Sequence, residues 1–185
     1  IIDPTLVFAT YDGANSDNFG MTATYGHDGT AYSGGTVYGN DYPNPDPLAY
    51  DINSNFTVLN GSYGITDVFI SKYSADGTQM IWGTFLGGGN NTQGTETIHS
   101  MICDLQDNLY VFGATSSNDF PTTPGAFDVS FNGGNTTYNT NFYYNGVYFQ
   151  NLGTDIYVAK FSANGHNLLG STYVGGNGND GVNFE

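Results

Sequence analysis

The sequence repeats itself, and this repetition limits the folds open to the chain more than any other feature. The stretch TDVFISKYSADGTQMIWGTFLGG at 66–88 aligns without a gap with TDIYVAKFSANGHNLLGSTYVGG at 154–176. A second pair of blocks, at 32–51 and 110–128, shares the tetrapeptide Asn-Asp-(Tyr/Phe)-Pro. Tandem copies of this kind stack side by side, so that neighbouring units bury each other's apolar faces.

Each repeat carries four runs with the character of β-strands, separated by turn residues. Gly, Asn, Thr and aromatic residues are abundant, and no stretch has a sustained helical apolar period, so we expect an all-β chain. The sequences HDGT, QDNL, ADGT and ANGH place Asp, Asn or Gly where a tight reversal needs positive φ. Strands are expected at 6–11, 19–26, 30–38 and 67–74 in the first copy, at 80–87, 96–104, 109–116 and 155–162 in the second, and at 168–174.

Four antiparallel strands recurring at this spacing describe one blade of a β-propeller. The chain then divides into a first repeat at 1–79 with an insertion at 52–66, a second at 80–167 with an insertion at 129–154, and the start of a third at 168–185. A propeller ring needs roughly four to eight blades. We therefore expect a fragment of a larger ring, and the alternative is a ring assembled from several copies of the chain.

Three blocks resemble one known repeat family. STYVGGNGNDG (171–181), NLYVFGATSSNDFPTTPGAFD (108–128) and DIYVAKFSANG (155–165) are similar to the T-Y-L-G-G, Y-V-x-G-x-T-x-S-x-x-F-P-T-T and D-x-F-V-x-K segments of the bacterial β-propeller repeat family called SBBP. The match covers nearly all of 80–183 and, more weakly, 6–77. The resemblance implies a bacterial protein that is secreted or held at the cell surface, and it implies a fold more than a chemistry.

The charge balance is strongly acidic, because 17 Asp and Glu residues face two lysines and no arginine, for a formal net charge of −15. Phosphate contacts need clustered Lys and Arg, so nucleic acid is not expected as a partner. The lack of arginine also argues against propeller enzymes that clamp carboxylate or phosphate substrates. No apolar run approaches the ~18 residues of a membrane-spanning helix, so none is expected.

The residues that could carry catalysis occur at repeated positions. Lys72 and Lys160 occupy the same place in the two copies, as do Asp67 and Asp155. A catalytic group needs a unique environment, so we expect structural roles: the lysines paired with a carboxylate or backbone carbonyls, the aspartates forming strand ends. No unrepeated pair of carboxylates stands out for a glycosidase. The chain is therefore predicted not to be an enzyme.

One calcium-binding pattern appears once. The stretch GGNGNDGVN at 175–183 fits the nonapeptide of calcium-loaded β-helices, but such sites need tandem copies, so we interpret it as a recurring turn. No cofactor is expected. A bound structural Ca²⁺ remains an alternative, with Asp12, Asp17 and Asp180 as oxygen donors. The sole cysteine, Cys103, lies in an apolar strand pattern and is expected to be buried.

Aromatic residues collect in the two insertions, which follow the third expected strand of each copy. FYYNGVYF at 142–149 predicts a hairpin with a two-residue Asn-Gly turn. Exposed Tyr and Phe beside Asn suit the recognition of sugars or proteins, whereas rings packed on a blade edge would be structural. The candidate ligand-binding residues are Tyr143, Tyr144, Tyr148 and Phe149, with Phe56 and Tyr63 from the first insertion.

The function expected from these features is a non-catalytic scaffold at the cell surface that binds proteins or glycans. Three alternatives stay open: a carbohydrate-binding lectin that uses the aromatic hairpins, a module that assembles with further copies or blades of itself, and, least favoured, a propeller hydrolase. They differ in what each must show: glycan binding, a mass several times 19.8 kDa, or two close carboxylates in a deep polar pocket.

Overall fold

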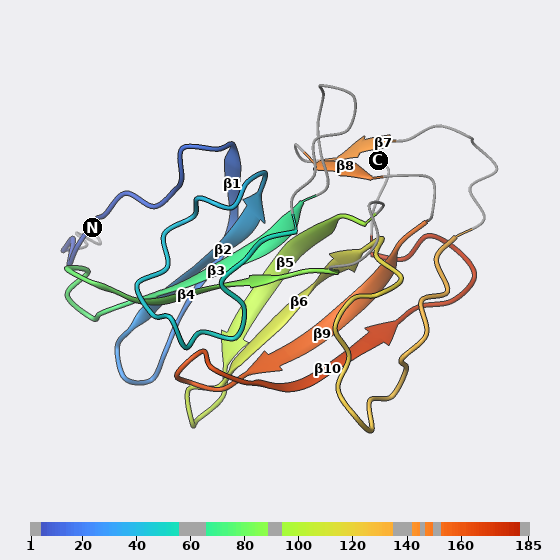
Figure 1. The fold of residues 1–185 in the computed structure, drawn as a ribbon. Coiled ribbons are helices and arrows are strands. Elements are labelled where there is room, and N and C mark those ends of the chain that lie inside the picture. Colours follow the sequence, from blue (N-terminus) through green and yellow to red (C-terminus); the bar gives the residue numbers. More distant parts are fainter. Residues whose placement is uncertain are drawn as a thin grey trace, which may run out of the picture.

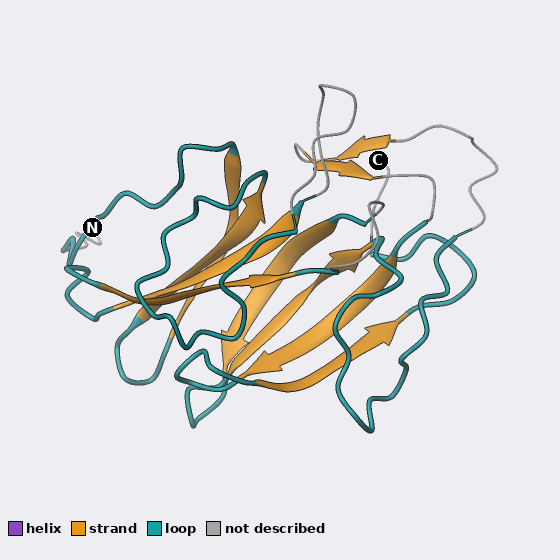
Figure 2. Cartoon of the chain, in the orientation of Figure 1, coloured by secondary structure: helices purple, strands orange, loops and turns teal. Residues whose placement is uncertain are grey.

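Two four-stranded antiparallel sheets form most of the chain (Figure 1). The computed structural model describes residues 5–55, 66–88, 94–134, 142–144, 147–149 and 153–181. All regular structure in these ranges is β, and they contain no helix (Figure 2). The all-β class predicted from the sequence is confirmed.

Within each sheet every strand pairs with its neighbour in sequence order, apart from the inserted hairpin. The first sheet consists of β1 (Asn18–Tyr25), β2 (Ala31–Val37), β3 (Asp67–Tyr73) and β4 (Met80–Leu86), in that order. The second consists of β5 (Glu96–Cys103), β6 (Leu109–Thr115), β9 (Asp155–Phe161) and β10 (Leu168–Val174), in the same order. A separate two-stranded sheet joins β7 (Phe142–Tyr144) and β8 (Val147–Phe149).

The tight turns use the residues that the sequence offered for positive φ. Gly29, Gly77 and Gly165 have φ of 83°, 67° and 74°, and Asp107 has φ of 59° in the turn between β5 and β6. Glycine adopts this left-handed region without a steric penalty, and aspartate tolerates it better than most residues. The four predicted turns are therefore confirmed.

The strand predicted at 6–11 is wrong, because residues 5–17 contain no strand. In the repeat this segment corresponds to β4 and β10, and each of those pairs with a third strand. In both sheets the third strand already pairs with a fourth strand, β3 with β4 and β9 with β10. The N-terminal segment therefore has no third strand to pair with. The strand expected to open the second copy, β4, instead completes the first sheet. The two insertions consequently lie between the second and third strands of each sheet.

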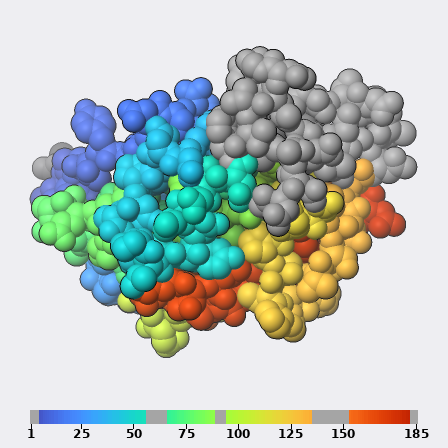
Figure 3. Space-filling model, in the orientation of Figure 1, coloured from blue at the N-terminus to red at the C-terminus, as the bar shows by residue number. Residues whose placement is uncertain are grey.

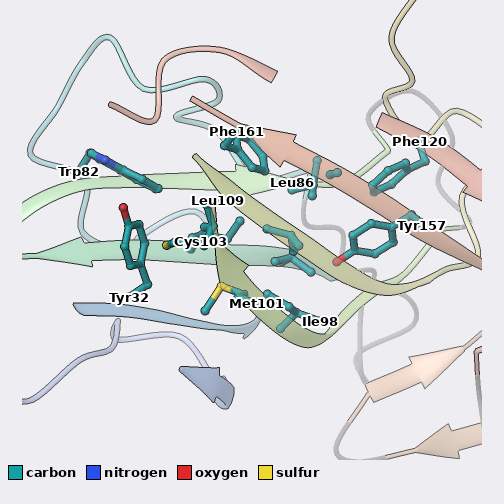
Figure 4. Close-up of a cluster of buried hydrophobic side chains, with 14 of the residues drawn as sticks. Tyr32, Trp82, Leu86, Ile98, Met101, Cys103, Leu109, Phe120, Tyr157 and Phe161 are labelled. Atoms are coloured by element: carbon teal, nitrogen blue, oxygen red, sulfur yellow. The ribbon is translucent and has the colours of Figure 1, made fainter. Parts of the chain in front are cut away.

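The main core lies between the two sheets, which pack face to face (Figure 4). Tyr32 and Trp82 stand at one end of the labelled cluster, and Phe120 and Tyr157 at the other. Cys103 is buried there, as predicted. The buried members are Tyr32, Val68, Ile70, Trp82 and Leu86 from the first sheet, and Ile98, Met101, Cys103, Leu109, Val111, Phe120, Tyr157, Ala159, Phe161 and Tyr173 from the second sheet and its loops.

The shared Asn-Asp-(Tyr/Phe)-Pro block has a packing role in both copies. Tyr42 stacks on Phe69 of β3 with ring centroids 4.0 Å apart, and Phe120 stacks on Tyr157 of β9 at 4.5 Å. Such ring pairs contribute about 0.5–1.5 kcal/mol beyond the area they bury. The block therefore fixes a long loop against the third strand of its own sheet.

Candidate functional site: the outer face of the second sheet

The two sheets present equivalent faces to different surroundings. Ile70 and Lys72 of β3 face the second sheet and are 0% and 6% exposed. Their counterparts in β9 are Val158 and Lys160, which lie on the side of the second sheet that faces away from the first sheet. Both are only half-buried. The first face is covered by the second sheet and its loops.

A tight turn of the second sheet is seated on the face of the first. The backbone carbonyl of Ala163 accepts hydrogen bonds from Lys72 Nζ and Trp82 Nε1, each at 3.3 Å. Gly165 lies against the Trp82 ring, where an added Cβ would come within 2.6 Å of it. Only glycine permits so close an approach, and its φ of 74° also favours glycine.

The loop at 44–51 holds the same turn from the other side. Tyr50 N donates to the carbonyl of Gly165 at 2.9 Å, and His166 Nε2 lies 2.8 Å from Asp46 Oδ2. Figure 3 shows this loop, in cyan, resting on the orange-red turn. We call Tyr32, Lys72, Trp82 and residues 44–51 the first socket, and residues 162–167 the turn that occupies it.

The second sheet repeats the positions of the tyrosine, the lysine and the long loop, but a cavity lies between them. A cavity of about 390 Å³ opens beside Tyr110 and Lys160, bounded by residues 123–127 and by β10. Register explains the space: Trp82 pairs with Lys72 across β4 and β3, and Gly170 pairs with Lys160 across β10 and β9. The indole of Trp82, which lines the first socket, therefore has no counterpart in the second sheet. We call Tyr110, Lys160, Gly170 and residues 123–127 the second socket.

The lysine of each socket is held by its own sheet. Lys160 Nζ lies 2.9 Å from Asp104 Oδ2 and 3.0 Å from the Tyr110 hydroxyl, with the Tyr110 ring centroid at 4.6 Å. These hydrogen bonds, first with Tyr110 and then with Asp104, raise the pKa of Lys160. Lys72 Nζ similarly lies 3.3 Å from Asp28 Oδ2 and 5.1 Å from the Tyr32 ring centroid. The structural role predicted for both lysines is confirmed.

Two buried carboxyl groups meet where the sheets join. Asn55 N donates to Asp67 Oδ2 at 2.7 Å, and Thr115 Oγ1 donates to Glu96 Oε1 at 2.6 Å. The other oxygens, Asp67 Oδ1 and Glu96 Oε2, both face Gly87, whose added Cβ would lie 2.1 and 2.8 Å from them. Burial raises the pKa of Asp67, and the charges of Asp51 and Asp119 add to the increase. Burial also raises the pKa of Glu96, and the charge of Asp67 adds to it. The site thus favours a protonated carboxyl.

The second copy repeats this strand-end geometry. Asn132 N donates to Asp155 Oδ2 at 2.7 Å, and an added Cβ on Gly175 would lie 2.4 Å from Asp155 Oδ1. Burial raises the pKa of Asp155 as well. The strand-end role predicted for Asp67 and Asp155 is confirmed, and the glycine that follows each fourth strand makes room for the aspartate.

The aromatic hairpin predicted at 142–149 is present in the backbone. In the β7–β8 register Tyr143 pairs with Tyr148, Tyr144 with Val147, and Phe142 with Phe149. The candidate residues Phe56 and Tyr63 of the first insertion lie outside the described residues. Binding by these aromatic residues stays a prediction.

The three candidate calcium donors do not converge. Asp12 accepts hydrogen bonds from the hydroxyls of Ser33 and Tyr42, on the first sheet. Asp180 Oδ2 accepts from Gly176 N at 2.8 Å, which closes the local turn predicted there. No group of three or more His, Cys, Asp or Glu side chains able to hold a metal ion occurs within the described ranges. Asp12, Asp17 and Asp180 therefore do not form a shared site.

The second socket was missed by reasoning from sequence, although one signal pointed to it. In the ungapped alignment of 66–88 with 154–176, the tryptophan of one copy is replaced by glycine in the other. A large aromatic residue lost from a matched strand position indicates a space at that position. Residues 123–127 gave no signal, because their place beside Lys160 depends on how the long loop folds back.

Comparison with protein-family models and with curated proteins finds no match for this chain. The described residues contain no helix long and apolar enough to cross a membrane.

Proposed function

We propose that this chain is a non-catalytic scaffold, part of a β-propeller of SBBP type, in which the outer face of the second sheet binds a further sheet of the same repeat. The equivalence of the two faces carries this proposal: the face containing Ile70 is covered by a neighbouring sheet, and on the matching face Val158 is only half-buried among the described residues. A surface with similar residues in the same register, apart from Gly170 in place of Trp82, offers related contacts.

A backbone hydrogen bond that joins the first sheet to the second has an equivalent at the end of the second sheet. Glu96 N, at the start of β5, donates to the carbonyl of Thr66 at 3.0 Å, and Asp180 N donates to the carbonyl of Thr154 at 2.7 Å. Thr66 and Thr154 are equivalent, so Asp180 occupies on the second sheet the position that Glu96 occupies on the first. Residue 180 thus lies where the inner strand of a following sheet would start.

Exposed apolar side chains on this face supply the driving force. Ile102, Leu169 and Val174 are 59%, 51% and 40% exposed. Full burial of one such side chain stabilises an interface by about 1.5–3 kcal/mol. Ile102 lies on β5 and the other two on β10, the two edge strands of the sheet, so a docked sheet would cover apolar side chains at both edges.

The ionisable groups support a scaffold rather than a catalyst. Asp67 and Glu96 are 1% and 0% exposed, so neither carboxyl is open to a substrate. Lys72 and Lys160 are each held by an aspartate of their own sheet. Each of these groups lies at a junction between strands or sheets, where its partners belong to the protein itself.

Sedimentation velocity at increasing protein concentration tests the docking face. The chain should associate reversibly, and Val158→Glu should abolish the association because it places a charge in the centre of the face. Leu48→Glu is the matched control, since Leu48 is 68% exposed and lies on the loop at 44–51, away from this face. A chain that stays monomeric at millimolar concentration, or equal association of both variants, would contradict the proposal.

We further propose that the scaffold acts outside the cytoplasm, secreted or at a bacterial cell surface. The support is the resemblance of the repeat to the SBBP family. Protease added to intact cells that express the full-length protein should degrade this segment, and degradation only after lysis would argue against an external location.

A second candidate function is ligand binding by the β7–β8 hairpin, favoured by the two tyrosine positions that its register sets opposite each other. Flat aromatic rings suit sugars and protein surfaces. Tyr143→Ala and Tyr148→Ala should abolish binding on a glycan array, whereas Tyr25→Ala, at a residue 76% exposed on β1, should not. An array that stays blank for the unaltered chain removes the glycan option.

A further inference from the structure

We propose that the second socket is a docking site for a tight turn of the type Ser-Ala-(Asp/Asn)-Gly, presented by the third and fourth strands of a neighbouring sheet of this repeat. This inference rests on the proposed function and specifies the element through which the further sheet is recognised. Its template is the first socket, which holds such a turn within this chain.

The seated turn is a rigid local unit. Gly165 N donates to the carbonyl of Ser162 at 2.8 Å, and Ser162 Oγ donates to Asn164 Oδ1 at 2.6 Å. These bonds hold the carbonyl of Ala163 outward, where Lys72 and Trp82 reach it. Little conformational entropy is then lost on docking, because the turn is already formed by its own contacts.

The chain builds the same unit a second time at 74–79. Gly77 N donates to the carbonyl of Ser74 at 2.8 Å, and Ser74 Oγ donates to Asp76 Oδ1 at 2.6 Å. An added Cβ on Gly77 would lie 2.1 Å from the ring of Phe8, just as Gly165 lies against Trp82. Phe8 occupies the repeat position of Trp82. A turn glycine covered by an aromatic ring is therefore a recurring contact of this repeat.

The wall of the second socket is constructed like that of the first. Phe85 N of β4 donates to the carbonyl of Asp51 at 3.0 Å, and Tyr173 N of β10 donates to the carbonyl of Asp128 at 3.1 Å. In each sheet the long loop is thus tied to the fourth strand. Residues 123–127 stand beside Lys160 as residues 44–51 stand beside the docked turn.

Lys160 supplies the polar contact that a docked turn needs. An ammonium has three N–H donors, and the contacts with Asp104 and Tyr110 use two of them. The third suits a backbone carbonyl, the acceptor that Ala163 provides to Lys72. Gly170 leaves the space that the indole fills in the first socket, and an added Cβ there meets nothing within 4 Å. The second socket can therefore admit a turn more deeply than the first.

Titration of the ¹⁵N-labelled full chain with a cyclised hairpin peptide of residues 157–172 tests this inference. Amide shifts should appear at Tyr110, Thr123, Ala126 and Gly170, with a dissociation constant of about 1 mM or tighter, which is a few kcal/mol of binding free energy. A peptide carrying Gly165→Val should bind at least tenfold more weakly, because the turn then loses its positive-φ residue.

A variant of the chain provides the second control. Gly170→Trp should fill the second socket and abolish the peptide shifts, while an otherwise unchanged spectrum shows that the fold is intact. Absent shifts, shifts confined to other surfaces, or equal binding by either control would overturn the inference. The peptide could fail to bind while the chain still associates with itself in a way that Val158→Glu prevents. The outer face of the second sheet would then still be an interface, and only the turn would be excluded as its contact. Failure of both removes the proposed function as well.

Discussion

The first and second sheets carry nearly the same residues on corresponding faces, yet one face is a core and the other is a surface. Lys72 has a side chain 7% exposed and Lys160 one 27% exposed, although both belong to the same strand of the repeat. The difference arises from the neighbour: the first face has the second sheet on it. The repeat therefore buries a face where a neighbouring sheet lies on it and leaves the matching face of the second sheet half-buried.

The largest expected effect of this difference is on stability at the fourth strand. Trp82→Ala should lower the free energy of unfolding by about 3–5 kcal/mol, because the indole is 1% exposed and its loss leaves a cavity between the sheets. Val174→Ala, on the second sheet, should cost less than about 1 kcal/mol, because Val174 is 40% exposed whereas its counterpart Leu86 is buried. Urea denaturation of the two variants measures both. Similar costs would mean that the open face is covered in solution.

The next effect concerns the junction of the sheets and depends on pH. Burial raises the folded-state pKa of Asp67 and Glu96, so the native state binds their protons more tightly than the unfolded chain. Their contribution to stability is fully present below about pH 4, the ordinary pKa of a carboxyl, and is lost as the pH rises through the raised values.

Glu96→Gln tests this effect. The variant should be more stable than the unaltered chain by about 1–3 kcal/mol at pH 8 and no more stable at pH 4, because an amide needs no proton to remain neutral and can donate toward Asp67. Asp180→Asn, at the equivalent position on the open face, should change stability less, since Asp180 is partly exposed. Thermal unfolding from pH 4 to pH 8 measures the difference. A gain for Glu96→Gln that does not vary with pH would argue against proton binding as its cause.

The sequence predicted the strands and turns of these sheets better than their grouping. Apolar runs bounded by Gly, Asp and Asn locate strands, because those residues supply the φ values that end a strand. The repeat alone does not say which strand begins a sheet, since a cyclic pattern can be cut at any point. For that reason the segment at 6–11 was expected in a strand, and β4 was assigned to the second copy.

The sockets were beyond prediction for a different reason. A socket is formed by a loop, two strands and a turn that are distant in the sequence, as the contact between Asp46 and His166 illustrates. Local propensity carries no information on such contacts. The strand register pairs Trp82 with Lys72 and Gly170 with Lys160. Only this pairing shows that the change from Trp to Gly leaves space beside a lysine.

Removing the lysines should produce a smaller difference between the faces. Lys72→Met should cost about 1–2 kcal/mol, because it leaves the partly buried carbonyl of Ala163 with one donor fewer. Lys160→Met should cost less than about 1 kcal/mol, since its ion pair with Asp104 is partly exposed to solvent. Chemical denaturation of the two variants gives the comparison. If Lys160→Met costs as much as Lys72→Met, the exposed pair is stronger than its exposure indicates.

A further comparison concerns the first turn of each sheet, where Gly29 in one copy corresponds to Asp107 in the other. Gly29→Ala should cost about 1–2 kcal/mol, because φ is 83° there and a left-handed conformation strains an ordinary L-residue. Space is not the cause, since an added Cβ would meet only Ala75 Cβ, at 3.4 Å. Gly29→Asn should cost less than Gly29→Ala, although both add a Cβ, because asparagine tolerates this region.

In the equivalent turn of the second sheet, backbone strain at Asp107 is offset by a hydrogen bond that its side chain accepts. Asp107→Gly should relieve the strain at φ 59° but lose the hydrogen bond that Asp107 Oδ1 accepts from His27 N at 2.6 Å, so the net change should be within about 0.5 kcal/mol. That hydrogen bond joins the first turns of the two sheets, which explains why the second copy keeps an aspartate where glycine would be less strained. Equal costs for Gly29→Ala and Gly29→Asn would show that backbone conformation does not decide the residue at this position, and the aspartate would then need another reason.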